Sequence, residues 1–172
     1  MIKFNQYSKS STIGSENLSF RKYMSEENTK FAKYVNGTLT RIEPEDFGDM
    51  TTLSDYCITG SKSLERIEMS DNIVSASLLS ISLLPNLKEI VFSANFSSFE
   101  DGFLSTIPLL NLSSDVTLDF SKAKQVPTSS GEAYSSSYFH AKITTIKVPV
   151  DLYDQWIKAY PFKIHVSIIV AV

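Results

Sequence analysis

The residues that could carry nucleophilic or acid–base chemistry are few. The chain has two histidines, His140 and His165, and one cysteine, Cys57. A Ser/His/Asp arrangement could be assembled from Ser137, His140 and Asp119. Serine-rich chains supply such trios by chance, however, and no nucleophile-elbow sequence surrounds these residues. We therefore expect a protein that is not an enzyme.

Acidic side chains occur in three groups that could be considered as metal ligands. The groups are Glu26-Glu27, Glu43 with Glu45 and Asp46, and Glu100-Asp101. The second and third lie in predicted turns and lack the alternating Asp/Asn spacing of a calcium loop. A single cysteine excludes an internal disulfide and a cysteine-based zinc site, and it reads as a small buried apolar residue. The sequence therefore predicts no metal and no cofactor.

The composition narrows the class of partner. The 172 residues fit one domain with a short appendage, and a hydrophobic content of 42% is enough for a core. A net charge of -3 gives no basic surface for nucleic acid. No apolar stretch approaches the ~20 residues of a membrane span or the run of a secretion signal. We expect neither nucleic-acid binding nor membrane insertion, and a protein made in the cytoplasm.

Five short apolar stretches recur along the chain with the same internal spacing. They are Leu39–Ile42, Leu64–Met69, Leu87–Phe92, Val116–Phe120 and Ile143–Val148. Aligned on their central apolar residue, they follow one another at steps of 25, 23, 28 and 28 residues. Repetition at a period of 20–50 residues is typical of a solenoid, in which each unit buries its apolar face against its neighbours.

Alternation within each stretch predicts a strand with one face in the core and the other in water. Equivalent positions of stacked parallel strands lie about 4.8 Å apart and form ladders. The inward ladder is Ile42, Ile67, Ile90, Leu118 and Ile146, with Met69, Phe92, Phe120 and Val148 beside it. The outward ladders are Arg41, Arg66, Glu89, Thr117, Thr145 and Glu43, Glu68, Val91, Asp119, Lys147.

The charged outward positions are the candidate binding residues. They are Arg41, Glu43, Arg66, Glu68 and Glu89. The two arginines would repel each other if they were alone, and the two neighbouring glutamates offset that repulsion. A mixed ladder is also what an ordinary solvated sheet face carries, so both interpretations stay open.

The segments around the repeats differ from them. Residues 1–35 are polar, contain no repeat, and are either a partly ordered tail or an N-terminal attachment segment that orders on a partner. Residues 36–160 hold the repeats and their cap. Between the first strands we expect Leu53, Cys57 and Ile58 to turn inward. The corresponding segment 78–87 is expected to be more helical.

The C-terminal part predicts a cap and a tail. Asp151–Tyr160 has apolar residues four apart, including Trp156, which predicts a short amphipathic helix covering the open end of the core. Pro149 and Pro161 set its limits. Residues 161–172 are strand-like, with His165 placed on the final strand. They either finish this domain or pair with a neighbouring chain.

Several segments resemble the BspA-like leucine-rich repeat family. Asp55–Ile67 is similar to its repeat, D-Y-A-F-x-G-C-x-S-L-x-x-I, and Tyr34–Ile42 to the beginning of such an array. Residues 126–128, 142–149 and 152–156 resemble its closing module, V-P-T … I-x-V-P-x-x-L-x-D-x-W. The resemblance covers about residues 31–160. It departs at Cys57-Ile58, where the family has Ala-Phe, and at Ser61, where the family often has Cys. Residues 161–172 lack the usual ending.

The resemblance implies a β-rich α/β solenoid, a short right-handed array of parallel strands with a C-terminal capping helix, used for attachment. Proteins like this occur on bacterial surfaces and among structural proteins of gut bacteriophages. The short array without a secretion signal or wall anchor favours a virion protein, such as a capsid decoration, a head fibre or a tail-associated receptor-binding protein. The alternative is a bacterial cell-surface adhesin.

The same resemblance gives expectations about partners. Residues 1–35 would bind other virion proteins, and the repeats would face a host cell-surface protein or glycan. The protein would be a homo-oligomer or would be present in many copies on a particle, which raises the avidity of weak single contacts.

Overall fold

The structure is a computed structural model, and it describes residues 40–53, 57–59, 63–77, 80–82, 84, 86–100, 115–129, 143–159 and 162–172. Within these ranges the chain forms twelve short strands, one α-helix and several 3₁₀ turns. This part of the chain is therefore rich in strands and poor in helix. All the strand pairs in it are parallel. The predicted attachment segment 1–35, Ser137 and His140 lie outside the described residues.

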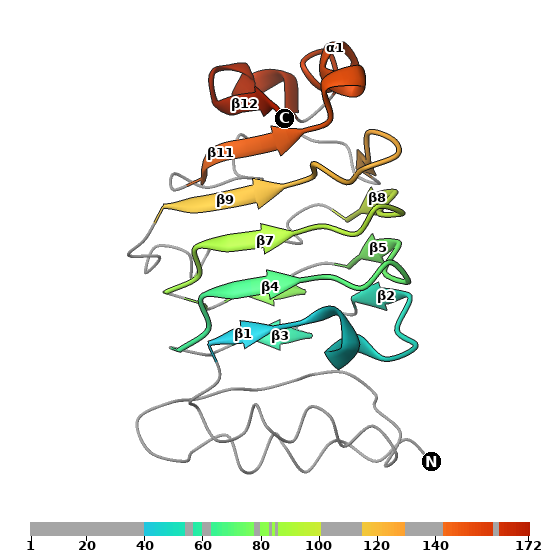
Figure 1. The fold of residues 1–172 in the computed structure, drawn as a ribbon, viewed down its shortest axis with the longest axis vertical. Helices are drawn as coiled ribbons and strands as arrows, with labels where there is room; N and C mark the ends of the chain where they lie inside the picture. Colours follow the sequence, from blue (N-terminus) through green and yellow to red (C-terminus); the bar gives the residue numbers. More distant parts are fainter. Residues whose placement is uncertain are drawn as a thin grey trace.

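The largest sheet contains the five predicted repeat strands and one more. Its strands, in spatial order, are β1 (Arg41–Ile42), β4 (Arg66–Glu68), β7 (Glu89–Val91), β9 (Val116–Asp119), β11 (Ile143–Val148) and β12 (Ile169–Ala171). They are stacked along the long axis of the molecule (Figure 1). The register aligns Ile42, Ile67, Ile90, Leu118, Ile146 and Ile169. The predicted inward ladder is therefore confirmed, and its five predicted members are fully buried.

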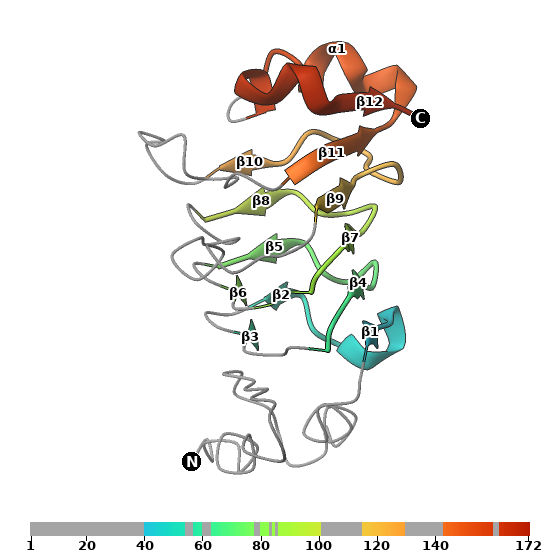
Figure 2. The same cartoon turned by 90° about the vertical axis from the view of Figure 1, so that its left-hand side faces the viewer.

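Two smaller parallel sheets lie beside the large one, and the sequence interpretation missed both. The first contains β2 (Thr52–Leu53), β5 (Ser75–Ala76), β8 (Ser98–Phe99) and β10 (Thr128–Ser129), and the second contains β3 (Ile58–Thr59) and β6 (Ile81–Ser82). Figure 2 shows them stacked alongside the large sheet. Because β6 pairs with β3, the prediction of a more helical segment over 78–87 is wrong at Ile81–Ser82.

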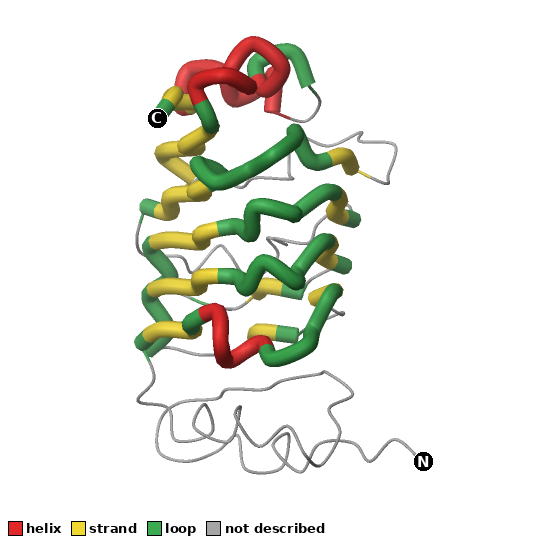
Figure 3. Tube along the Cα trace, turned by 45° about the vertical axis from the view of Figure 1, so that its right-hand side comes forward, coloured by secondary structure: helices red, strands yellow, loops and turns green. Residues whose placement is uncertain are grey.

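A repeated β-turn carries the chain out of the large sheet. The backbone N–H of Met50, Ile73, Phe96 and Ala123 donates to the carbonyl three residues earlier, at 2.8–3.2 Å. In the first passage a short 3₁₀ helix, Pro44–Phe47, precedes the turn, and Gly48 adopts a positive φ of 56°. Only glycine reaches such a backbone conformation without steric cost. Successive passages therefore leave the sheet in the same direction (Figure 3).

The core is one cluster of buried side chains that ends in a group of aromatic rings. Phe120 stacks on Phe92 with ring centroids 3.9 Å apart, and it contacts Trp156 at 4.7 Å. Phe162 lies against both Phe120 and Trp156, at 5.9 and 4.4 Å. Such pairs add stabilisation beyond the apolar area that they bury. Leu53, Cys57 and Ile58 point inward, as predicted, and are fully buried.

The predicted C-terminal helix is present but shorter than expected. The α-helix α1 is Tyr153–Trp156, and a 3₁₀ turn over Val150–Leu152 precedes it. The helix therefore does not extend over Asp151–Tyr160 as an α-helix. Short 3₁₀ turns at helix ends are common, because they satisfy terminal carbonyl and amide groups locally. Trp156 from α1 is fully buried against Phe120, and α1 lies above β11 in Figure 1.

The C-terminal tail, residues 161–172, also differs from the predicted strand. A 3₁₀ helix occupies Phe162–Ile168, so the final strand is Ile169–Ala171 and His165 belongs to the helix. The mostly apolar sequence Val166–Val172, in which Ser167 is the one polar residue, has no period that distinguishes a strand from a helix, so it did not indicate where the strand begins. β12 pairs with β11 of the same chain, so Ile169–Ala171 belongs to the large sheet of this domain.

Removing the ring at the centre of the aromatic group should be costly. We expect Phe120→Ala to lower the free energy of unfolding by about 3–5 kcal/mol, because it leaves a cavity between three other rings. Urea unfolding followed by circular dichroism measures this. Val74→Ala, which trims a side chain that is 37% exposed, is the control and should change stability by less than about 0.5 kcal/mol. A loss below about 1.5 kcal/mol for Phe120→Ala would contradict the packing described.

Candidate functional site

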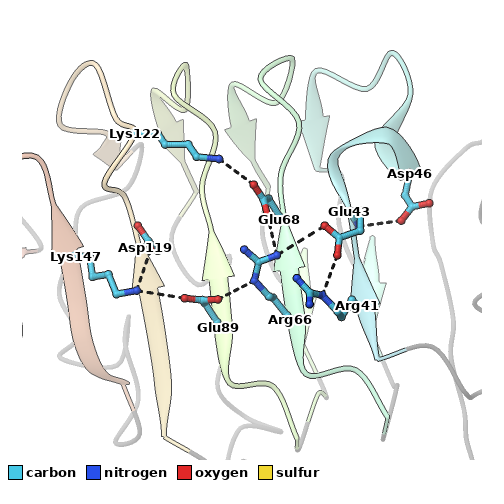
Figure 4. A network of polar contacts seen from close by, with 9 residues as sticks. All are labelled: Arg41, Glu43, Asp46, Arg66, Glu68, Glu89, Asp119, Lys122 and Lys147. Atoms are coloured by element: carbon cyan, nitrogen blue, oxygen red, sulfur yellow. Dashed lines mark hydrogen bonds and ion pairs between the residues drawn. The ribbon is translucent and has the colours of Figure 1, made fainter. Parts of the chain in front are cut away.

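The strand register brings the predicted outward residues onto one face of the large sheet. Arg41, Arg66 and Glu89 align across β1, β4 and β7. Glu68, Val91, Asp119 and Lys147 align in the same way across β4, β7, β9 and β11. Glu43 follows β1 directly and lies beside Glu68's strand (Figure 4). We call this surface, with Lys122, the charged face.

Arg66 is the centre of the charged face. Its guanidinium lies 2.8 Å from Glu68, 2.8 Å from Glu89 and 3.8 Å from Glu43. Arg41 pairs with Glu43 at 2.9 Å. Hydrogen bonding to Glu89, together with Glu68, raises the pKa of Arg66 above its usual value despite partial burial. The five candidate residues therefore contact one another, and the glutamates neutralise the repulsion between the two arginines.

Two lysines that were not among the candidate residues complete the network. Lys147 lies 3.0 Å from Asp119 and 3.4 Å from Glu89. Lys122, from the turn after β9, lies 2.9 Å from Glu68. The ladder alignment contained the signal for Lys147, which was placed outward. Nothing in the sequence pattern indicated Lys122, because its contact with Glu68 spans 54 residues and joins the turn after β9 to β4, a strand that is not adjacent to β9.

One apolar residue of the charged face, Val91, is buried. It lies between Glu68 and Asp119 in the outward ladder, yet it is only 5% exposed. The Lys122–Glu68 pair connects the strands on either side of β7, the strand that carries Val91. Long charged side chains commonly cover apolar surface with their methylene stems. The expectation of a plainly solvated outward ladder is therefore wrong at Val91.

The charges of this network cancel. Four cations (Arg41, Arg66, Lys122, Lys147) face four acids (Glu43, Glu68, Glu89, Asp119). A face without net charge does not attract a charged molecule from a distance. Arg41 and Lys122 have side chains that are each 55% exposed, which leaves them the most accessible cations of the network.

Two carboxyls of the network are held in their charged form. The hydrogen bond from Lys122, with a further one from Arg66, lowers the pKa of Glu68 below its usual value in spite of burial. Burial raises the pKa of Asp119, but hydrogen bonds from Ser121 and Lys147 outweigh it and the net shift is downward. The same contacts raise the pKa values of Lys122 and Lys147.

Of the Ser/His/Asp trio, only Asp119 lies among the described residues. Asp119, the acid of the Ser/His/Asp trio considered above, accepts a hydrogen bond from the Ser121 amide at 2.9 Å and pairs with Lys147. Among the described residues no group of three or more His, Cys, Asp or Glu side chains could hold a metal ion. None of the described helices has the length and apolar character needed to cross a membrane.

Comparison with known proteins gives no assignment: no family model and no curated protein matches the sequence. The resemblance to BspA-like repeats therefore stays a prediction from the quoted residues.

Removing the central cation should destabilise the protein, because three carboxylates lose their shared partner. We expect Arg66→Met to lower the free energy of unfolding by about 1–2 kcal/mol, measured by urea unfolding at low salt. Lys88→Met is the matched control. It removes a cation that pairs with Glu65 at 3.0 Å in a more exposed position, and should cost less than about 0.5 kcal/mol. Equal losses in the two variants would show that the network adds nothing to an ordinary surface pair.

The charged face should also make stability depend on pH in the acid range. A carboxyl with a lowered folded pKa stabilises the fold above its unfolded pKa of about 4, and this stabilisation is lost as the pH falls through the folded value. We expect thermal stability to fall between about pH 5 and pH 2, and to fall less in Glu68→Gln. Glu65→Gln, with a side chain that is 46% exposed, is the control. If Glu68→Gln followed the wild-type curve, Glu68 would not be responsible.

Proposed function

We propose that the chain is a short right-handed leucine-rich-repeat solenoid of the BspA-like type that acts by binding and catalyses no reaction. The observation that carries this proposal is the register of the large sheet. All five stretches recognised in the sequence pair in order, each with its apolar residue in the same ladder. A chain built in this way offers a continuous surface with regularly spaced side chains, which is how repeat proteins bind their partners.

The proposed biological role is that of a structural or adhesive component of a bacteriophage virion. Residues 1–35 would dock on another virion protein, and the repeats would face outward toward a host cell-surface protein or glycan. The resemblance to repeats of phage structural proteins supports this role. The alternative, a bacterial cell-surface adhesin, uses the same fold and the same kind of surface, and fold alone does not decide between them.

The charged face is the surface that we propose for partner binding. Its network is held in place by pairs at 2.8–3.8 Å, so its pattern of charges is set before a partner arrives. Pre-organised side chains lose less conformational entropy on binding than mobile ones. Since the face is neutral in sum, one copy would bind weakly, and many copies on a particle would supply avidity.

Fractionation of a bacterial culture that produces the protein tests whether it is located in a phage particle. An antibody raised against the full chain would follow it through a density gradient of lysed culture. We expect the protein to band with DNA-containing phage particles and to remain there after a salt wash. Banding with the cell envelope instead would support the adhesin. Recovery only in the unsedimented fraction would contradict both roles.

A further inference from the structure

The outward ladder of the large sheet holds two valines whose exposure differs. Val91 on β7 is 5% exposed, whereas Val170 on β12 is 47% exposed. The register places both in one ladder, through Glu68, Val91, Asp119, Lys147 and Val170. In the described part of the chain β12 is the last strand of this sheet, with a paired strand on one side, which explains part of the difference. The rest requires side chains that lie over Val91, because an outward residue in the middle of a sheet is buried only by neighbouring side chains.

Two carboxylates flank Val91, and each is held by a cation of its own. Glu68 on β4 and Asp119 on β9 are the residues that align with Val91. The Glu68 carboxylate lies 2.8 Å from the Arg66 guanidinium. The Asp119 carboxylate lies 3.0 Å from the Lys147 ammonium. Both carboxylates are therefore kept beside Val91 without any help from the turn after β9.

Lys122 comes from this turn and reaches over β7. Its ammonium lies 2.9 Å from the Glu68 carboxylate, so the pair joins the turn after β9 to β4, the strand on the other side of β7. Figure 4 shows the lysine side chain crossing β7 on its way to Glu68. Among the described residues this is the one ion pair that Lys122 forms, and its side chain is 55% exposed. A lysine stem is apolar and can lie on a residue such as Val91 while its ammonium stays in water.

We propose that Lys122 is a strap that closes over Val91 and opens when its single ion pair with Glu68 breaks. Exposed ion pairs are weak and are screened by salt, so the strap opens readily. Because Arg66 holds Glu68 separately, opening moves the lysine and leaves the carboxylate in place. The charged face then has two forms, and only the open form presents a valine at its centre. An apolar group reaches Val91 only in that form, whatever partner the face binds.

Thiol labelling of the full-length protein measures the opening. Val91→Cys replaces the valine with another small apolar side chain and serves as the reporter. Iodoacetamide reacts with the thiolate, so rates are compared after correction for the fraction of thiolate at each pH. We expect the addition of Lys122→Ala to Val91→Cys to raise the rate about tenfold, because the thiol loses its cover. The native Cys57 is fully buried, so its lack of reaction reports that the fold is intact.

The adjacent lysine of the same connection is the matched control. Lys124 is exposed, and its ammonium donates to the Asn95 side-chain oxygen at 2.9 Å, away from Glu68. Addition of Lys124→Ala to the reporter should change the labelling rate by less than about twofold. An unchanged rate after Lys122→Ala, or an equal rise in the two variants, would overturn the proposal.

A second measurement keeps the native valine. A soluble paramagnetic agent broadens the nuclear magnetic resonance signals of methyl groups that it can approach. We expect it to broaden the Val91 methyl signals more in Lys122→Ala than in the wild-type protein, and to leave them unchanged in Lys124→Ala. Higher salt should act in the wild-type protein in the same direction as Lys122→Ala, because it screens the ion pair. Equal broadening in all three proteins would show that Lys122 does not cover Val91.

Discussion

The backbone hydrogen bonds between parallel strands are the constraint on which the rest of this structure depends. They place equivalent residues of successive strands one above another, at a spacing set by the peptide groups and not by the side chains. An apolar residue at one position must therefore pack on apolar residues above and below it, as Ile67 does between Ile42 and Ile90. The same constraint places Arg66 between Arg41 and Glu89, so the charges of this face must balance along the stack as well as within each strand.

The sequence was informative where a residue's surroundings repeat and uninformative where they do not. The ladder through Ile90 and Leu118 could be predicted from the spacing of the apolar stretches. This spacing of 23–28 residues stays recognisable even though the side chains of successive stretches differ. The sheet containing β2 and β5 was missed, since two-residue strands are too short to show alternation. Its signal lay in the similar turns, Ser70-Asp-Asn-Ile73 and Ser93-Ala-Asn-Phe96, which the comparison of apolar stretches passed over.

The charged face, too, could be predicted from the sequence only in part. Arg41, Arg66 and Glu89 could be assigned to one face from the strand pattern. Their mutual pairing and the burial of Val91 could not be predicted, because the strand pattern does not show where long side chains end. Lys122 reaches Glu68 across an intervening strand, and only coordinates relate a turn residue to a strand two positions away. In the proposed binding role, the face would offer a partner an arrangement of compensated charges, and specificity would arise from the positions of the charges and not from their sum.

The direction of stacking has a mechanical consequence. β1 and β12 stand at opposite ends of the large sheet, and the hydrogen bonds between strands run along the line that joins them (Figure 1). A pulling force applied between these two ends would act on every strand pair at once, because the pairs are connected in series, and the weakest pair would separate first. Force applied along the strands would instead load all bonds of a pair in shear. A tether that holds the protein at one end and its load at the other would thus yield strand by strand, with extension increasing in steps.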